Sequence, residues 1–251
     1  MSRLKSPVRQ EWVDPGICSL DYRLKVIGRL PFFRHLSPHA IVEINHLFED
    51  RDFSVDQVIY FEGEPGRNLY LVASGKVKLT RWALSGREVL LDILQGGEYF
   101  GHLSIASQQV YSETSVAQTD CCILQISAHN FETVMNRYPD VTMQVLKAVG
   151  QRLEELQEII KQLSLYTVEE RIAATLIRVA RKLGEQKQTG MLIQIPFSRH
   201  DLAAMTGTTV ETVSRVMSRF STDGLISTGR KWVVLRDLER LEQIVKESAL
   251  N

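Results

Sequence analysis

The sequence has few cysteines and no long hydrophobic run, and both absences narrow the class of protein. Its 251 residues include only three cysteines, Cys18, Cys121 and Cys122. They are too few and too scattered for a disulfide framework, and adjacent cysteines pair poorly with each other. No run of about 18 apolar residues is present, and the first residues, MSRLKSPVRQEW, lack the apolar core of a secretory signal. We therefore expect a protein of the reducing cytoplasm that does not span a membrane.

The sequence also lacks an excess of charge of either sign, but its charge is unevenly distributed. Residues 1–164 carry 17 Lys and Arg against 20 Asp and Glu, whereas residues 165–251 carry 13 against 10. A positive excess in the C-terminal third is typical of a surface that faces phosphate groups. The asymmetry is small, so it supports a nucleic-acid partner only together with other signals.

Short apolar stretches separated by glycines occupy the segment from about residue 53 to 127. They include NLYLVASGKVKLTRW, REVLLDILQ and CCILQIS, which are rich in Val, Ile, Leu and Tyr. Strands of this length at regular turn spacing predict a sandwich or barrel. Ahead of them, SPHAIVEINHLFED predicts a helix with Ser37 as its N-cap and Pro38 at its first position.

A long helix is predicted from Pro139 to about Tyr166. Its apolar residues are separated alternately by three and four positions, which is the pattern of a coiled-coil seam. These seam residues are Leu146, Val149, Leu153, Leu156, Ile160 and Leu163. A helix that packs on its own domain is the alternative, but such a helix usually has a wider apolar face. The pattern therefore favours a parallel homodimer.

The C-terminal segment is predicted to be helical, with a small hairpin at its end. TVEERIAATLIRVARKL begins with a capping box formed by Thr167 and Glu170. The polar stretch GEQKQTG, residues 184–190, predicts a loop. LISTGRKWVVL predicts two strands around a turn near Thr228 and Gly229.

The stretch FSRHDLAAMTGTTVETVSRVMSRF predicts a helix-turn-helix. Ser198 is expected to cap a first helix that runs to about Thr206, and Gly207 permits a tight turn. Thr208 or Thr209 then caps a second helix from about Val210 to Phe220. Such a pair of helices is typical of proteins that bind the major groove of DNA.

Three polar residues share one strip on the second helix, because they are spaced i, i+3 and i+4. Arg215 can bond guanine with both arms of its guanidinium group, Glu211 can accept from cytosine, and Ser214 can do either. The alternative is a solvated surface on which Glu211 and Arg215 merely pair with each other. Contacts to the DNA backbone are predicted for Arg199, Thr208, Thr209, Arg230 and Lys231.

This order of parts resembles the CRP/FNR family of bacterial transcription regulators over about residues 29–240. TVETVSR resembles the recognition helix of the FNR branch, in which Glu, Ser and Arg read TTGAT-type half-sites; the cyclic-AMP branch usually has Arg where this chain has Val210. GEPGRNLYLVASGKVKL resembles the β-roll signature of the family. The resemblance implies an α+β fold and a homodimeric DNA-binding regulator rather than an enzyme. Its parts would be an N-terminal extension of unknown role (1–28), an antiparallel β-roll sensor domain (29–138), a dimerisation helix (139–166) and a winged helix-turn-helix (167–251).

The effector pocket that the resemblance implies departs from the family pattern. His102 stands where cyclic-AMP-binding members have a second Glu, and Ser112 with Glu113 stands near their phosphate-binding Arg. With Thr114, these residues line the expected pocket, and a buried cyclic phosphate facing Glu113 would be poorly stabilised. Three cysteines cannot supply the four thiolates of an iron–sulfur cluster from one subunit. Haem bound by His102, for sensing carbon monoxide or nitric oxide, is one alternative. A redox switch at Cys18 and ligand-free activity controlled only by expression level are the others, and the effector stays unassigned.

The remaining expectations concern partners and rival functions. By the same resemblance, the turn WALSGREV (82–89) is expected to contact RNA polymerase, and a hinge is expected near residues 165–167. One rival is a small-molecule binding module whose winged helix makes protein contacts. Another is a thiol or metal enzyme built on His102, Cys121 and Cys122, but no base-and-orienter pattern accompanies these residues.

Overall fold

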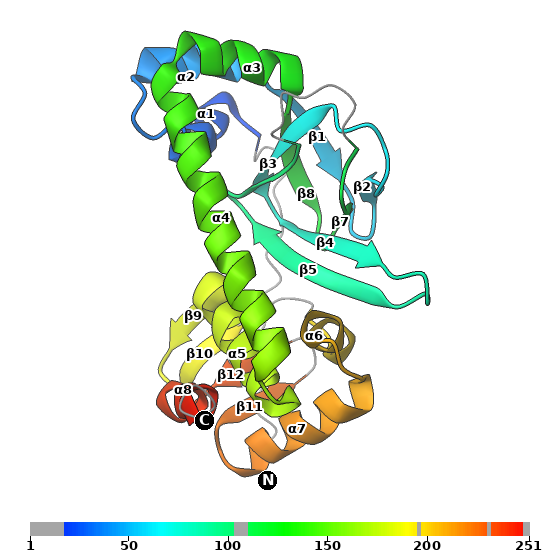
Figure 1. Cartoon of the computed structure of the whole chain (residues 1–251). Helices are drawn as coiled ribbons and strands as arrows, with labels where there is room; N and C mark the ends of the chain where they lie inside the picture. The colour runs from blue at the N-terminus through cyan, green and yellow to red at the C-terminus, as the bar shows by residue number, and fades with distance from the viewer. Residues whose placement is uncertain (1–17, 103–109, 195–196, 230–231, 248–251) are drawn as a thin grey trace. The chain divides into compact units, whose positions relative to one another are not determined.

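The computed structural model describes residues 18–102, 110–194, 197–229 and 232–247, and the chain forms two compact units. The first unit ends at Glu155 and the second begins at Leu156, so the boundary falls inside the long helix α4 (Pro139–Leu165) (Figure 1). None of the helices in the described parts of the chain combines the length and apolarity that a bilayer crossing requires.

The first unit is built around two four-stranded antiparallel sheets, as the sequence predicts. One sheet has the order β1-β8-β3-β6 and the other the order β2-β7-β4-β5. The strands are β1 (Glu49–Phe53), β2 (Val58–Tyr60), β3 (Asn68–Ser74), β4 (Lys76–Trp82), β5 (Glu88–Gln95), β6 (Tyr99–Gly101), β7 (Thr114–Ala117) and β8 (Cys121–Ser127). The helices of this unit, besides the first part of α4, are α1 (Leu20–Arg29), α2 (Pro38–Asn45) and α3 (Ala128–Arg137).

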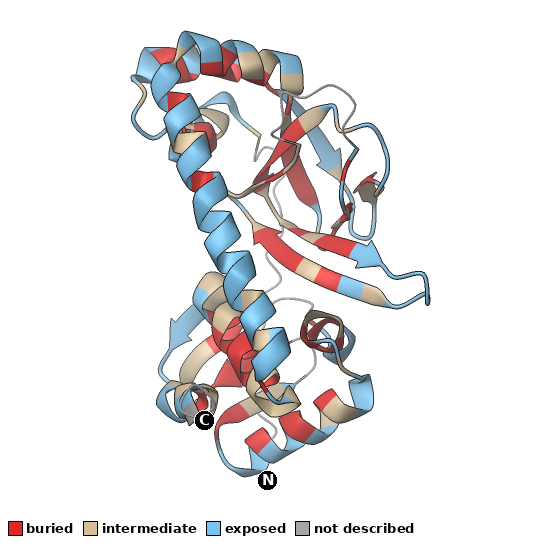
Figure 2. Ribbon diagram, in the orientation of Figure 1, coloured by how far each residue is buried: buried red, intermediate tan, exposed pale blue. Residues whose placement is uncertain are grey.

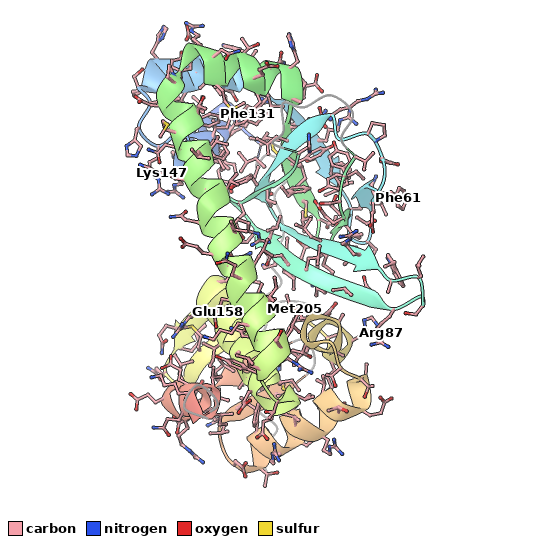
Figure 3. The ribbon with its side chains drawn as sticks, viewed as in Figure 1. Phe61, Arg87, Phe131, Lys147, Glu158 and Met205 are labelled. Carbon is pink, nitrogen blue, oxygen red and sulfur yellow. A yellow bond between two sulfur atoms is a disulfide. The ribbon has the colours of Figure 1, made fainter. Side chains whose placement is uncertain are left out.

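Strands β3 and β8 are buried on both faces, which explains why they are apolar almost without interruption. Because successive side chains of a strand point to opposite faces, Leu71 and Leu124 enter a core beneath the helices, with Phe131 of α3 (Figure 3). Val72 and Ile123 enter a second core between the two sheets. Strands β3 and β8 therefore contribute side chains to two separate cores, one on each of their faces.

The loop joining β3 to β4 depends on Gly75, whose φ is +86°. A Cβ at this position would lie 2.3 Å from the carbonyl oxygen of Asp120 and 2.7 Å from Sγ of Cys121. Gly86 in the β4–β5 turn also has a positive φ, +75°, but a Cβ there would meet nothing within 4 Å. A substitution at Gly86 therefore introduces backbone strain alone, whereas a substitution at Gly75 introduces both backbone strain and a steric clash.

We expect Gly86→Ala to reduce the free energy of unfolding by about 1–2 kcal/mol, the usual cost of a left-handed non-glycine residue. Gly75→Ala should reduce it by a further 1–3 kcal/mol or so, because the added methyl group must displace the strand β8 backbone. Urea unfolding of the two variants measures the difference. Equal unfolding midpoints would contradict the close packing at Gly75.

The second unit contains α5 to α8 and a small antiparallel sheet of order β11-β12-β10-β9. Its elements are α5 (Val168–Leu183), β9 (Gly184–Lys187), β10 (Gly190–Ile193), α6 (Arg199–Thr206), α7 (Val210–Thr222), β11 (Ile226–Gly229), β12 (Trp232–Leu235) and α8 (Leu238–Glu247). The predicted capping box at the start of α5 is confirmed, because Thr167 accepts from the backbone of Glu170 and the Glu170 side chain accepts from the backbone of Thr167.

The predicted loop at residues 184–190 is wrong. Residues Gly184–Lys187 form strand β9, which pairs with β10 from Gly184↔Ile193 to Lys187↔Gly190. Polar residues are tolerated there because β9 lies at the edge of the sheet with its side chains largely in solvent. The sequence pattern lacks the apolar alternation that signals a strand, so only pairing with β10 defines it.

Candidate DNA-binding interface

Helices α6 and α7 form the predicted helix-turn-helix, and local hydrogen bonds fix their starts. Ser198 caps α6 by accepting from the backbone of Asp201 at 3.0 Å, and the Asp201 carboxylate accepts from the backbone of Ser198 at 2.7 Å. Gly207 ends α6 in a left-handed conformation, with φ +63°. Thr209 caps α7, accepting from the backbone of Thr212 at 3.3 Å. The turn is therefore set by residues within four positions of each other.

The apolar face of α7 is buried, and this fixes which face is open. Val213, Val216, Met217 and Phe220 are all buried in the second unit. Glu211 and Arg215 are exposed on the helix, while Ser214 between them is half-buried. The structure thus places the three predicted base-reading side chains on the accessible side of α7, near its N-terminus.

Arg199, predicted to bind DNA phosphate, lies against this strip. Its Nη1 donates a hydrogen bond to the Ser214 hydroxyl at 3.1 Å. The two residues come from different helices, so no spacing rule in the sequence signals the contact. A side chain predicted to position the protein on the DNA backbone therefore also orients a side chain predicted to read bases.

The environment of Glu211 favours its ionised carboxylate, which accepts hydrogen bonds. Hydrogen bonds from its own backbone N–H and from the Thr209 hydroxyl lower the pKa of its carboxyl group. Among the described contacts, no ion pair joins Glu211 to Arg215, and both side chains are exposed on α7.

The other predicted backbone contacts have different positions. Thr209 is exposed at the start of α7, and Thr208 is half-buried with its N–H donated to the carbonyl of Ala203 at 3.2 Å. Strands β11 and β12 form the predicted hairpin, with Gly229 opposite Trp232. Arg230 and Lys231, which come between these two strands in the sequence, lie outside the described residues.

The predicted seam of α4 is apolar and open to solvent. Its residues are between 44% and 64% exposed, far more than the leucines buried in the cores. The six seam residues are Leu146, Val149, Leu153, Leu156, Ile160 and Leu163. Figure 2 shows most of α4 in the colour of exposed residues, with buried positions confined to its N-terminal part. The buried positions are Val141 and Ala148, which face the first unit. A contiguous apolar stripe of this kind marks an interaction surface.

The residues predicted to line the effector pocket include an acidic side chain that accepts hydrogen bonds from its neighbours. The Tyr60 hydroxyl donates to the Glu113 carboxylate at 2.8 Å, and the Ser112 hydroxyl donates to the same carboxylate. Thr114 accepts from the backbone of Glu62 at 3.0 Å. Burial, with the neighbouring Glu113 charge, raises the pKa of Tyr60, so this hydroxyl stays a donor.

Four aromatic rings fill the core beside Glu113. The rings of Tyr60 and Tyr111 stack with centroids 3.8 Å apart, and Tyr70 lies 5.4 Å from Tyr60 and 5.2 Å from Phe100. The hydroxyls of Tyr70 and Tyr111 lie 3.3 Å apart and share a hydrogen bond. The Glu113 carboxylate therefore lies beside a core that the stacked rings fill.

His102, the predicted alternative haem ligand, follows β6. Its backbone N–H donates to the carbonyl of Asn68 at 3.0 Å. Its ring Nε2 is shielded from solvent and has no hydrogen-bond partner among the described residues.

The structure joins Cys18 to Cys122 by a disulfide, which the sequence did not indicate. The two residues are 104 positions apart, so only the packing of the segment ahead of α1 on strand β8 brings them together. Cys121 is a free, buried thiol.

Comparisons with known proteins agree with this architecture. Residues 50–138 match the cyclic nucleotide-binding domain family, and residues 170–244 match the Crp-like helix-turn-helix domain family. The cyclic AMP receptor protein of Thermus thermophilus is 33% identical over 214 residues, which are 85% of this chain and 96% of the relative. The CRP-like cAMP-activated global transcriptional regulator of Mycobacterium tuberculosis is 28% identical over 217 residues, 86% of this chain and 97% of the relative.

Solved structures extend the likeness to three dimensions. FixK2 from Bradyrhizobium japonicum superposes with a TM-score of 0.70 at 25% identity, covering 78% of this chain and 96% of that one. A β-roll, a long helix and a Crp-like helix-turn-helix together make up a DNA-binding transcription regulator. The chain belongs to the CRP/FNR family.

Proposed function

We propose that this regulator binds DNA as a homodimer and reads a palindrome of TTGAT-type half-sites. The observation that carries the proposal is the open strip of Glu211, Ser214 and Arg215 on α7. An Arg that is free to bond guanine and a Glu that stays ionised suit adjacent guanine and cytosine contacts in a major groove. Two such helices, related by two-fold symmetry, match half-sites one helical turn apart.

The α4 seam supports the homodimer. The apolar side chains of an exposed stripe with a strict a/d spacing become buried when the same stripe of a second copy packs against them. The pairing would also place the two reading strips on one molecule, as a palindrome requires.

Fluorescence anisotropy with a labelled TTGAT palindrome tests the proposed sequence preference. We expect wild-type protein to bind this duplex at least about 10-fold more tightly than a duplex in which the guanine of each half-site is replaced by adenine, since each mismatched pair costs about 1–3 kcal/mol. Equal affinity for the two duplexes at the same salt concentration would contradict the assignment of half-site.

Arg199 is predicted to act on all DNA sequences alike. Arg199→Ala should weaken binding to the palindrome and to the adenine-substituted duplex by a similar factor, and should lower the salt dependence by roughly one counterion per subunit. Because Arg199 also holds Ser214, a small loss of base preference is expected at most. A salt slope identical to that of wild type would contradict the phosphate contact.

We further propose that cyclic AMP is not the effector, although the names of two relatives refer to it. Glu113, with its Tyr60 and Ser112 donors, presents negative charge where the cyclic phosphate would need a cation. Isothermal titration of the protein with cyclic AMP should give no heat of binding. Saturable binding with one site per subunit would contradict this proposal.

A second candidate for the sensor is haem bound by His102, because its shielded Nε2 has no partner among the described residues. A histidine ring nitrogen is a common haem ligand. The stacked rings of Tyr60, Tyr70 and Tyr111 fill the core between the sheets, so His102 would be the residue of the described chain that holds the haem iron. A Soret band in the absorbance spectrum of the natively purified protein would support this candidate.

The β4–β5 hairpin is the surface that would contact RNA polymerase. It exposes Trp82 and Leu84, and Arg87 lies on the same hairpin (Figure 3).

An ion pair would connect the sensor sheet to the dimer helix. In the first unit, Arg152 of α4 lies 3.3 Å from the Asp92 carboxylate of β5. This ion pair links the sensor sheet to the helix that carries the seam, and it would transmit a change in the sheet to the dimer.

A further inference from the structure

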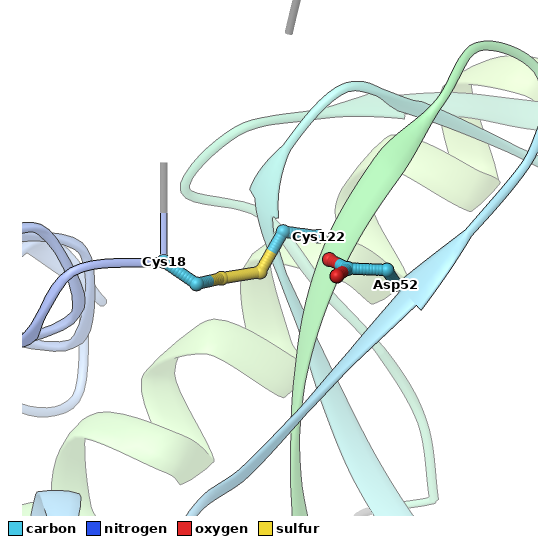
Figure 4. A group of neighbouring side chains, drawn as sticks. All are labelled: Cys18, Asp52 and Cys122. Atoms are coloured by element: carbon cyan, nitrogen blue, oxygen red, sulfur yellow. A yellow bond between two sulfur atoms is a disulfide. The ribbon is translucent and has the colours of Figure 1, made fainter. Parts of the chain in front are cut away.

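Cys18, Asp52 and Cys122 gather at one point of the first unit, on three different elements. Cys122 lies on β8, and Asp52 lies directly opposite it on β1, so that their side chains share a face of the sheet. Cys18 reaches the same face from the turn ahead of α1. Figure 4 shows the carboxylate of Asp52 beside the two sulfur atoms. The carboxylate oxygen and both sulfur atoms all lie within 4.8 Å of one another.

A purely structural disulfide does not account for the carboxylate of Asp52 beside its two sulfur atoms. Its carboxylate has no hydrogen bond or ion pair with any described residue, whereas Asp50, two residues earlier on the same strand, pairs with Arg23. A disulfide gains nothing from a neighbouring negative charge. Two thiolates and a carboxylate, by contrast, form an anionic cluster that a divalent cation would stabilise.

We propose that, when Cys18 and Cys122 are reduced, these two thiolates and Asp52 bind a thiophilic divalent cation of the Zn²⁺ type. Thiolate and carboxylate ligands at about 2.3 Å and 2.0–2.2 Å in a tetrahedron lie roughly 3.4–3.8 Å from each other, which the 4.8 Å cluster accommodates. Three protein ligands leave a fourth position open to water or to an added ligand. Cys18 precedes α1 rather than lying within it, so it can adjust when the sulfur–sulfur bond is absent.

The disulfide is then the oxidised, cation-free form of the same site. A low-molecular-weight disulfide, RSSR, is the class of oxidant required. The two bound thiolates lose two electrons and join as Cys18–Cys122, the RSSR bond breaks to give two RS⁻ ions, and the divalent cation leaves. Charge and atoms balance, with one cation released for each disulfide formed. The cation and the disulfide exclude each other because both require the same two sulfurs.

Metal binding to the full-length protein, reduced and kept without oxygen, tests the site. We expect wild-type protein to retain one Zn²⁺ per chain after dialysis, and to bind Co²⁺ with a thiolate charge-transfer band in the near ultraviolet. Cys18→Ser and Cys122→Ser should each weaken Zn²⁺ binding by at least about 100-fold, and Asp52→Asn by at least about 10-fold. Titration of wild-type protein with oxidised glutathione should release one Zn²⁺ per disulfide formed.

Cys121→Ser is the matched control. Cys121 is adjacent to Cys122 in sequence, but it points into the core between the sheets, where its thiol donates to the carbonyls of Lys76 and Thr119. This variant should bind Zn²⁺ as wild type does. Asp52→Asn separates the metal site from a purely structural disulfide, because it should lose the cation while oxidation still joins Cys18 to Cys122.

Three outcomes would overturn the proposal: no Zn²⁺ retained by reduced wild-type protein, Asp52→Asn with unchanged affinity, or Cys121→Ser with the same loss as Cys122→Ser. None of these measurements uses DNA, so failure of the metal site and failure of the proposed DNA recognition are distinguishable.

Discussion

Arg215→Ala is expected to abolish the preference of this protein for a TTGAT palindrome. One bidentate contact to guanine discriminates by about 1–3 kcal/mol, and a two-fold dimer loses two of them, which corresponds to roughly a 30-fold to more than 10,000-fold loss of specific affinity. Binding to duplexes of unrelated sequence should change little, because phosphate contacts supply that affinity. Anisotropy titrations with specific and unrelated duplexes measure both quantities.

Arg219→Ala is the control on the same helix. Its guanidinium group pairs with Glu169 of α5 and takes no part in the strip, so its removal should leave base preference unchanged. Exposed ion pairs contribute about 0–1 kcal/mol, so folding should also persist. If Arg215→Ala kept the wild-type ratio of specific to unrelated affinity, the reading role of Arg215 would be wrong.

Leu153→Glu is expected to convert the protein to a monomer at micromolar concentration. Leu153 is 57% exposed in the single chain and occupies an a position of the seam, so in a parallel pair the two copies would face each other. Losing two buried leucines costs about 3–6 kcal/mol per dimer, which is two to four orders of magnitude in the dissociation constant, and the facing carboxylates add repulsion. Sedimentation equilibrium measures the change.

Gln151→Glu adds the same charge to α4 two residues away, at an exposed position outside the seam. This variant should keep the wild-type association state and its affinity for the palindrome. If wild type itself proves monomeric, or if both variants associate equally well, the seam does not form a dimer.

The parts of the fold that the sequence predicts depend on neighbours in the chain. Ser198, Thr167 and Gly207 act on partners within four residues, so their roles as caps and turn can be read from spacing alone. The long helix is equally local, because hydrogen bonds along a helix join residues four apart. The helix-turn-helix and the open side of α7 follow from such signals.

The features that the sequence did not predict depend on contacts between separate elements of the fold. Cys18 and Cys122 are 104 residues apart, and the contact between Arg199 and Ser214 joins two helices. Strand β9 is polar and is defined only by its pairing with β10. The order of residues along the chain gives no direct measure of such proximity, whereas the folded sheet and helix packing create it.

Strand β8 couples two environments of the sensor unit, because neighbouring residues on it face opposite sides. Cys122 belongs to the core beneath the helices, and Cys121 belongs to the core that contains the stacked tyrosines. A strand in the interior of a close-packed protein cannot shift on one side alone. Forming or breaking the Cys18–Cys122 bond would therefore move β8, and with it the core that contains the stacked tyrosines. The oxidation state of the cysteines and the packing of that core would change together.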